Sequence, residues 1–282
     1  MAKEIGFMQG RLSPLMDGKI QAFPWPYWRQ EFALAAQHGF ALMEWTLDQD
    51  RLYENPLMTR AGRQEIARLM EQYGVAVKTL TGDCFMQAPF YKAQGQVRQQ
   101  LLADLQKVVQ SCAVVGINKV LLPLVDNGRL ENYQQEDDLV QTLSGMAPLL
   151  KDAGVQLMFE SDYPPERLAA FLGRLPSPYF GLTYDVGNSA ALGYQPEEEI
   201  DAYGPRILNV HVKDRLRGGG TVPLGEGDAN IPTALKALWD AGYKGPYILQ
   251  TARAQDGDHP GALCRYRDLV RNWLNQVDRH EP

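Results

Sequence analysis

The chain has 282 residues, of which 45% are hydrophobic and 22% are charged, with a formal net charge of −6 at pH 7. This composition is typical of a globular protein with a full core and excludes a mostly disordered chain. The acidic balance disfavours a nucleic-acid partner, because non-specific affinity for a phosphate backbone comes mainly from lysine and arginine. We expect one domain covering residues 1–282 and a small-molecule partner.

Strand-like and helix-like segments alternate along the whole chain. Five times a helix-like stretch ends in glycine and a short apolar run follows within a few residues. Glycine just past a helix end supplies the left-handed conformation from which a short loop re-enters a sheet. Three further apolar runs complete the set, so that the predicted strands are residues 4–9, 41–45, 75–80, 119–122, 156–160, 180–184, 207–212 and 246–250.

Apolar residues at helical spacing lie between these strands. They are Ile66, Leu69 and Met70, then Leu101, Leu105, Val108 and Val109, then Ile231, Leu235 and Leu238. Strands that alternate with helices pair in parallel. Eight such units favour a closed barrel, and no G-x-G-x-x-G follows the first strand as an open dinucleotide-binding sheet would require. The sequence therefore predicts an α/β fold, a single-domain (β/α)₈ TIM barrel.

Polar side chains stand where the last four predicted strands end. These are Glu160, Asp185, His211 and Gln250, and the active site of a TIM barrel is built at these strand ends. Taken singly, Asp185 is also a normal helix cap and His211 a normal core histidine. Four ligand-type residues on successive strands instead favour a site for a divalent metal, Mn²⁺, Mg²⁺, Co²⁺ or Zn²⁺.

A bound divalent cation polarises a sugar carbonyl and hydroxyl together and so stabilises the enediolate that forms when a base removes the α-proton. We expect Glu160 to be that base. Gln9 and Arg11 after the first strand and Glu44 on the second are expected to contact substrate hydroxyls, together with Asn188 after the sixth strand. A salt bridge between Arg11 and Glu44 is an equally good interpretation of that pair.

Basic residues follow His211 closely. Lys213, Arg215 and Arg217 lead into three glycines at 218–220, a loop flexible enough to close over a ligand. Arginine binds phosphate oxygens in a bidentate fork, although surface cations are commonly only solvated. Early aromatics, including Phe23, Trp28 and Trp45, stack on a sugar ring, pack the first strand-to-helix loop or form a homodimer contact.

The three cysteines, Cys84, Cys112 and Cys264, are an odd number without a close pair, which argues against a disulfide framework or a thiolate zinc site. No apolar run approaches the ~18 residues that a membrane span needs. Met1 is followed by polar residues rather than by a targeting segment. We therefore expect a cytoplasmic protein with no membrane partner.

Five motifs give the chain a resemblance to a known family. They are Ile-Gly-Phe-Met-Gln-Gly-Arg-Leu-Ser at 5–13, Gly-Phe-Ala-Leu-Met-Glu at 39–44, Tyr-Asp-Val-Gly-Asn at 184–188, His-Val-Lys-Asp at 211–214 and Leu-Gly-Glu-Gly at 224–227. With them the chain resembles the xylose isomerase-like barrels, a family of sugar-phosphate isomerases, ketose 3-epimerases, inosose isomerases and dehydratases, and apurinic endonucleases. The resemblance covers nearly the whole chain.

The resemblance implies a metal ligand set of Glu, Asp, His and Glu on strands five to eight. It carries over to Glu160, Asp185 and His211, whereas the fourth position is Gln250, which offers an amide oxygen but cannot take up a proton. In the ketose 3-epimerases two metal-bound glutamates act on opposite faces of the substrate, so Gln250 puts a two-base epimerisation in doubt. Arg217 matches the offset of a basic residue that touches the sugar in those enzymes.

We therefore expect a divalent-metal-dependent isomerase or epimerase of a sugar, cyclitol or sugar phosphate. Aldose–ketose isomerisation and dehydration each need only one base, which Glu160 could be. The alternatives to an isomerase or epimerase are a metal-dependent dehydratase of a keto-polyol and a non-catalytic polyol-binding barrel in which Gln250 marks lost chemistry. A DNA phosphodiesterase is disfavoured, because that activity in the family uses three zinc ions and more than the four histidines of this chain.

Overall fold

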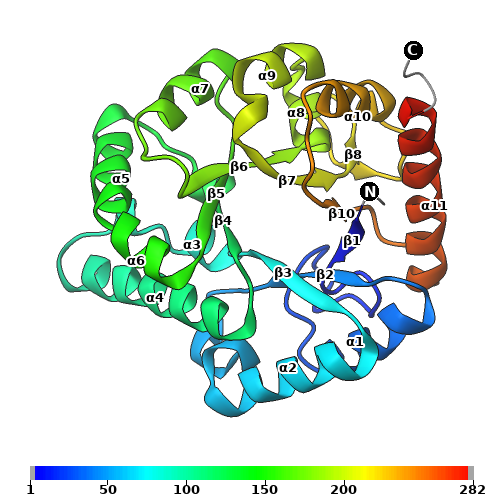
Figure 1. The fold of residues 1–282 in the computed structure, drawn as a ribbon, viewed down its shortest axis with the longest axis horizontal. Helices are drawn as coiled ribbons and strands as arrows, with labels where there is room; N and C mark the ends of the chain where they lie inside the picture. Colours follow the sequence, from blue (N-terminus) through cyan, green and yellow to red (C-terminus); the bar gives the residue numbers. More distant parts are fainter. Residues whose placement is uncertain (1–3, 279–282) are drawn as a thin grey trace.

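Eight parallel strands close into a barrel in the computed structural model, which describes residues 4–278 (Figure 1). The order around the barrel is β1-β10-β7-β6-β5-β4-β3-β2. The barrel strands are β1 (Ile5–Met8), β2 (Leu42–Thr46), β3 (Ala76–Thr81), β4 (Lys119–Leu124), β5 (Gln156–Ser161), β6 (Phe180–Asp185), β7 (Ile207–Val212) and β10 (Tyr247–Leu249). The predicted TIM barrel is confirmed, and each predicted strand overlaps one of these eight. Residues 1–3 and 279–282 of the predicted domain lie outside the described residues.

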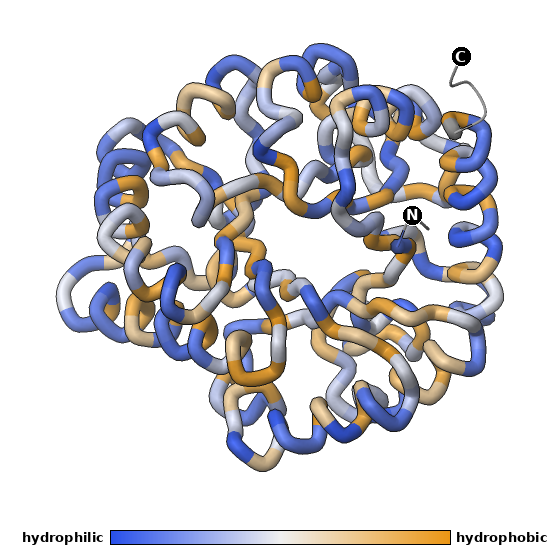
Figure 2. Tube along the Cα trace, in the orientation of Figure 1, coloured by the Kyte–Doolittle hydropathy of each residue, from blue (hydrophilic) through white to orange (hydrophobic). Residues whose placement is uncertain are grey.

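Helices surround the barrel (Figure 1). They are α1 (Trp28–Gln37), α2 (Arg60–Tyr73), α3 (Asp83–Gln87), α4 (Gly95–Val115), α5 (Tyr133–Gly145), α6 (Ala147–Ala153), α7 (Pro165–Gly173), α8 (Val186–Leu192), α9 (Pro196–Tyr203), α10 (Ile231–Asp240) and α11 (His259–Asp278). The three apolar patterns of helical spacing fall in α2, α4 and α10. Hydrophobic residues concentrate on the strands and on the helix faces turned toward them (Figure 2).

The glycines of the repeating pattern end helices as expected. Gly74, Gly116 and Gly154 cap α2, α4 and α6 with φ of 65°, 91° and 64°. This left-handed backbone is available to glycine without the steric cost that a Cβ imposes. The caps turn the chain from the outer helices back into the next barrel strand.

The early aromatics pack the first strand-to-helix loop rather than line a sugar site. Phe23, Trp28 and Trp45 are buried. The ring of Trp45 lies 5.4 Å from that of Phe23 and 5.9 Å from that of Trp28, measured between centroids. Such tilted and edge-to-face pairs add to the free energy gained by burying the rings.

A two-stranded hairpin follows β7 and shapes one side of the barrel mouth. It pairs β8 (Asp214–Arg215) with β9 (Thr221–Val222) in antiparallel fashion. The buried Asp214 carboxylate accepts hydrogen bonds from the backbone N–H groups of Gly225, Gly227 and Ala229. A Cβ on Gly227 would lie 2.1 Å from Asp214 Oδ1, so the Leu-Gly-Glu-Gly motif leaves room for this anchor.

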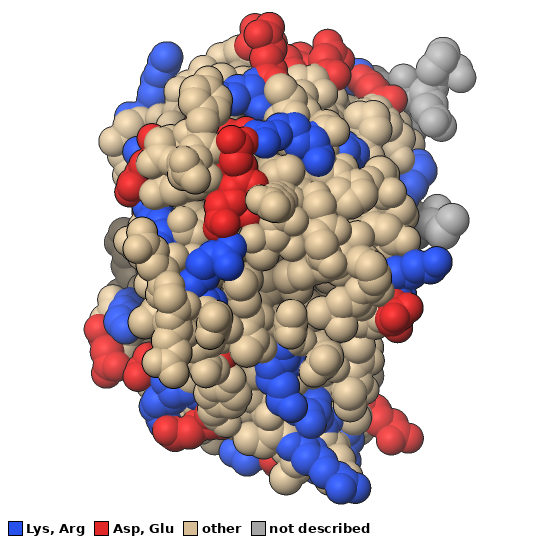
Figure 3. Space-filling model, turned by 90° about the vertical axis from the view of Figure 1, so that its left-hand side faces the viewer, with Lys and Arg blue, Asp and Glu red and all other residues tan. Residues whose placement is uncertain are grey.

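The surface carries both signs of charge. On the face seen in Figure 3, acidic and basic side chains are scattered among a larger uncharged area. Within residues 4–278, no helix combines the length and the apolar character that crossing a bilayer requires.

Candidate active site

A cavity of about 460 Å³ lies at the carboxyl ends of the barrel strands. Its wall combines residues from the ends of β3, β5 and β10, from the start of α8, and from the β1–α1 loop and the hairpin. Polar members of the wall include Gln21, Asp83, Glu160, Asn188, Lys213 and Gln250. This is the end of a TIM barrel at which reactive groups from different strands converge.

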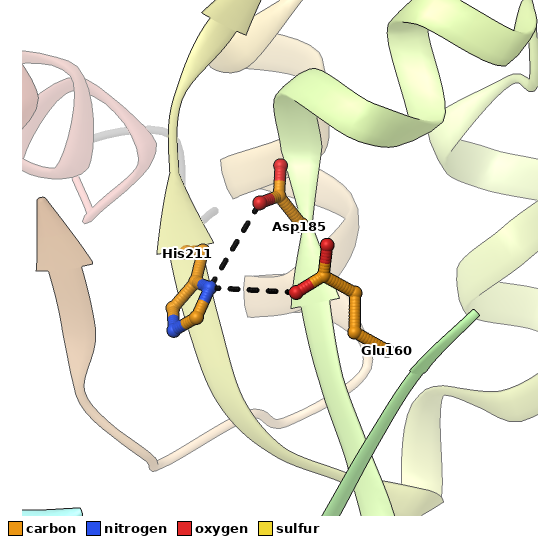
Figure 4. A group of neighbouring side chains, drawn as sticks. All are labelled: Glu160, Asp185 and His211. Carbon is orange, nitrogen blue, oxygen red and sulfur yellow. Dashed lines mark ion pairs between the residues drawn. The ribbon is translucent and has the colours of Figure 1, made fainter. Parts of the chain in front are cut away.

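Three of the four expected metal ligands meet beside this cavity (Figure 4). His211 Nδ1 lies 3.8 Å from Glu160 Oε2 and 3.8 Å from Asp185 Oδ2. One ligand atom from each residue lies within 4.8 Å of the other two. Glu160, Asp185 and His211 are 8%, 3% and 0% exposed, so the cluster is almost wholly removed from water.

Local structure fixes how the two carboxylates are turned. Asp185 ends β6 and caps α8, because its Oδ1 accepts a hydrogen bond of 2.8 Å from the backbone N–H of Asn188. Its other oxygen faces His211. The side-chain amide of Asn188 donates to Glu160 Oε1, which leaves Oε2 as the oxygen toward His211. Asp185 therefore serves both as a helix cap and as a potential ligand.

Glu44 orients His211 from inside the barrel. His211 Nε2 lies 2.7 Å from Glu44 Oε1, which also accepts from the hydroxyl of Thr81. Glu44 Oε2 accepts from the Thr79 hydroxyl and, at 2.8 Å, from Asn209 Nδ2. These four donors, from His211, Thr81, Thr79 and Asn209, occupy all the acceptor sites of the Glu44 carboxylate. Proton donation from Nε2 to Glu44 leaves the lone pair of His211 on Nδ1, the atom that faces Glu160 and Asp185.

Burial and like charge shift the acidity of these groups. Burial, reinforced by the neighbouring Asp185 carboxylate, raises the pKa of Glu160 to about 7. Burial alone would also raise the pKa of Glu44, but His211 and the two threonine hydroxyls hold the pKa of that carboxyl below its usual range. Burial disfavours the charged form of His211, yet the surrounding carboxylates raise its pKa.

The cluster suits a divalent cation. Among the described residues, the buried His211 Nδ1 has no hydrogen-bond partner, and a buried polar atom without a partner is costly unless a ligand satisfies it. Zinc binds carboxylate oxygen and imidazole nitrogen at about 2.0–2.2 Å, so small side-chain movements would bring all three atoms into one coordination sphere. Two carboxylates and one imidazole form a hard to borderline set.

Comparison with known proteins assigns the chain to a family. The family described as xylose isomerase-like TIM barrel matches residues 32–276. The chain belongs to this family. The L-ribulose-5-phosphate 3-epimerase UlaE of Salmonella heidelberg (strain SL476) is 27% identical over 257 residues, which cover 86% of this chain and 89% of that protein.

Solved structures share the fold of this xylose isomerase-like barrel. An L-ribulose 3-epimerase superposes with a TM-score of 0.75 at 17% identity and covers 100% of both chains. The IOLI protein, solved with a zinc atom, gives a TM-score of 0.77 at 15% identity and covers 97% of this chain and 99% of that one. At these identities the likeness establishes the fold alone.

The fourth expected metal ligand, Gln250, is engaged by a lysine. Gln250 Oε1 accepts a hydrogen bond of 2.8 Å from Lys213 Nζ, which also lies 2.7 Å from Asp185 Oδ2. Gln250 Nε2 donates at 2.8 Å to Gln21 Oε1. The ammonium of Lys213 thus lies between Asp185 and Gln250, and the amide oxygen of Gln250 is not free.

The expected substrate contacts divide into two groups. Asn188 and Lys213 line the cavity. Gln9, Arg11 and Glu44 do not, which corrects their predicted place in its wall. Gln9 Oε1 accepts from the backbone N–H of Thr46 and so joins β1 to β2, while Arg11 donates to the carbonyls of Ile20 and Thr251. Among residues 4–278, no ion pair joins Arg11 to Glu44.

Arg217 also lies away from the main cavity. It lines a separate cavity of about 180 Å³ beside Gly193 and Asp228. Strand β8 ends at Arg215, so the alternation that would place Arg215 and Arg217 on one face does not continue. Arg215 lines the main cavity instead and donates from Nη1 to Asn188 Oδ1 at 2.8 Å.

Asp83 and Gln21 are among the polar residues of the cavity wall that were not predicted. Asp83 follows the end of β3 by two residues, so the strand-end rule that selected Glu160 and Asp185 also applies to it. Gln21 lies in the long loop between β1 and α1, where no motif or periodicity indicates its position.

Proposed function

We propose that the chain is a divalent-metal-dependent isomerase or epimerase of a sugar, cyclitol or sugar phosphate. The observation that carries this proposal is Glu160, a buried carboxylate beside His211 and Asp185 that also lines the cavity. The pKa of Glu160, raised to about 7, matches a group that exchanges protons near neutral pH. The named activity of the UlaE relative, a 3-epimerase of a ketose phosphate, supports the same reaction class.

Glu160, Asp185 and His211 would hold the cation, with Gln250 as a fourth ligand once Lys213 moves aside. The cation would polarise the carbonyl and the neighbouring hydroxyl of the sugar and so lower the cost of α-proton removal. Glu160 removes that proton; its Oε1, the oxygen turned away from His211, accepts the proton while the Asn188 amide holds the carboxyl group in place. Lys213 and Arg215 are placed to donate to substrate oxygens in the cavity.

The cavity supports a polyhydroxylated substrate. Its volume of about 460 Å³ falls within the range of small-molecule sites. Lys213, Arg215 and Arg129 in its wall supply the positive charge that a sugar phosphate or an enediolate needs. The same wall also suits the hydroxyls of an unphosphorylated sugar or a cyclitol.

Dehydration of a keto-polyol is the second candidate, and Gln250 is the observation that favours it. Loss of a β-hydroxyl after α-proton removal requires one strong base, which Glu160 supplies. Epimerisation requires a proton donor on the opposite face of the substrate, and the amide of Gln250 cannot be that donor.

Proton exchange tests the proposed function. Purified protein loaded with Mn²⁺ or Mg²⁺ is incubated in D₂O with ketoses, cyclitols and their phosphates, and NMR follows deuterium at the carbon α to the carbonyl. Exchange with interconverted sugars, stopped by a chelator and restored by the cation, is the expected result. Exchange with loss of water would move the assignment to a dehydratase, and absence of exchange across the panel would favour a binding protein.

Gln250→Glu is expected to tighten binding of the divalent cation by about tenfold, equivalent to ~1.4 kcal/mol. The reason is that a carboxylate adds a full negative charge where the amide has only a dipole. Isothermal titration of the metal-free protein with Mn²⁺ measures the change. Gln195→Glu adds the same charge in the separate cavity beside Arg217 and serves as the control. Equal affinities in the two variants would show that Gln250 lies outside the metal site.

A further inference from the structure

Asp83 is a second buried carboxylate in the wall of the same cavity. It is 7% exposed and lies at the start of α3, directly after β3. Its Oδ2 accepts a hydrogen bond of 2.7 Å from Gln21 Nε2. Within the described part of the chain, Asp83 forms no ion pair and its Oδ1 has no hydrogen-bond partner. One carboxylate oxygen is therefore available to a molecule in the cavity.

A chain of hydrogen bonds links Asp83 to position 250. Gln250 Nε2 donates to Gln21 Oε1, and Gln21 Nε2 donates to Asp83 Oδ2. This direction of donation requires an amide at position 250, because the carboxylate of a glutamate could not donate to Gln21 Oε1. The neutral side chain at 250 and the carboxylate at 83 are thus parts of one consistent network.

We propose that Asp83 is the second acid–base residue of the cavity and transfers the proton that the amide of Gln250 cannot transfer. This inference rests on the proposed function and narrows it to epimerisation. Asp83, at the start of α3 after β3, and Glu160, on β5, line the cavity from two points of its rim with β4 between them. A sugar bound between these two points of the rim would meet one carboxyl group from each.

The environment of Asp83 suits proton transfer in both directions. Burial raises the pKa of the Asp83 carboxyl to about 7, against the opposing effect of the Gln21 hydrogen bond, and the nearby Asp48 carboxylate adds to the rise. A general acid or base is most effective when its pKa lies near the working pH. Both protonation states of Asp83 are then populated near neutral pH.

The proposed epimerisation consists of two proton transfers, one on each face of the carbon α to the carbonyl. Glu160 takes the proton from the carbon α to the carbonyl, and the C–H electron pair forms the double bond of the enediolate. Protonated Asp83 then gives its carboxyl proton to the opposite face of that carbon, and the carbonyl re-forms. The product is the epimer. Glu160 is left protonated and Asp83 ionised, and exchange with solvent restores both groups.

Asp83→Asn tests this role in the metal-loaded protein with a ketose or ketose phosphate that the wild type converts. Asparagine keeps the size of the side chain and an oxygen for Gln21 Nε2. We expect kcat for epimerisation to fall by about 10²–10⁴, the usual contribution of a general acid or base, while KM changes little. Deuterium from D₂O should still enter one epimer with retention of configuration, because Glu160 can still remove and return a proton on its own face of the substrate.

Two further variants separate catalysis from structure. Asp83→Glu should restore part of the lost kcat. Asp152→Asn removes an exposed carboxylate on α6, outside the cavity wall, and should behave like the wild type. Two results would overturn the role of Asp83 without overturning the proposed function. One is epimerisation by Asp83→Asn within about threefold of the wild-type rate, and the other is an equal loss of exchange from both epimers. Absence of exchange in the wild type would instead overturn the proposed function and this inference with it.

Discussion

Glu160→Gln is expected to lower kcat for sugar conversion by a factor of about 10³ or more, since it removes the base and leaves an isosteric amide. The α-proton exchange assay in D₂O measures the loss directly. The amide oxygen can still contact a cation, and Asp185 and His211 remain in place, so isothermal titration should still detect Mn²⁺ binding. Loss of turnover with metal binding retained distinguishes a missing base from a collapsed site.

The control for this variant is Asp162→Asn. Asp162 lines the same cavity but pairs with Arg129 at its mouth, so its neutralisation changes the charge of the wall without touching the cluster. We expect turnover by Asp162→Asn within a few-fold of the wild type. If Glu160→Gln retained turnover at the level of this control, Glu160 could not be the base.

The fold was predictable because its signals are local. Each of Gly74, Gly116 and Gly154 marks a helix end within a few residues of the following strand, and each adopts the positive φ that the position requires. The apolar runs that follow such caps have four to six residues, which is the usual length of a strand and shorter than a typical helix. Eight repeats of one local pattern leave few topologies other than a parallel barrel.

The core of the candidate site was predictable for the same reason. Glu160, Asp185 and His211 stand at or near the ends of consecutive strands, and parallel strands bring their carboxyl ends to one rim. Residues on loops were not predictable in this way. Gln21 reaches the cavity through a long loop, and Arg215 takes the place expected of Arg217 because β8 ends before the glycine turn.

The contacts that Glu44 makes could not be read from the sequence. All five residues of β2 are buried, so neither polarity nor alternation in the sequence shows which face Glu44 occupies. In the structure the Glu44 carboxylate lies inside the barrel, where it meets His211 and Asn209.

The position of Glu44 gives the second large expected effect. Glu44→Gln should weaken Mn²⁺ binding by about 10–100-fold, the usual result of removing the partner that orients a ligating histidine. It should also lower the free energy of unfolding by about 1–3 kcal/mol, because an amide offers two acceptor sites where four donors converge. The threonine hydroxyls can rotate, but His211 Nε2–H and the Asn209 amide then compete for one oxygen.

Isothermal titration and urea unfolding of the metal-free protein measure the two effects separately. Glu199→Gln is the matched control, since Glu199 is also a buried carboxylate but accepts from the hydroxyls of Tyr184, Ser189 and Tyr203. Each of those three hydroxyls can rotate to donate to the amide oxygen or accept from the amide N–H of a glutamine, and none of them is hydrogen-bonded to His211. Glu199→Gln should therefore keep its metal affinity. Equal loss of affinity in both variants would show that Glu44 acts through general stability, whereas loss confined to Glu44→Gln would mark it as the residue that aims His211 Nδ1 at the metal site.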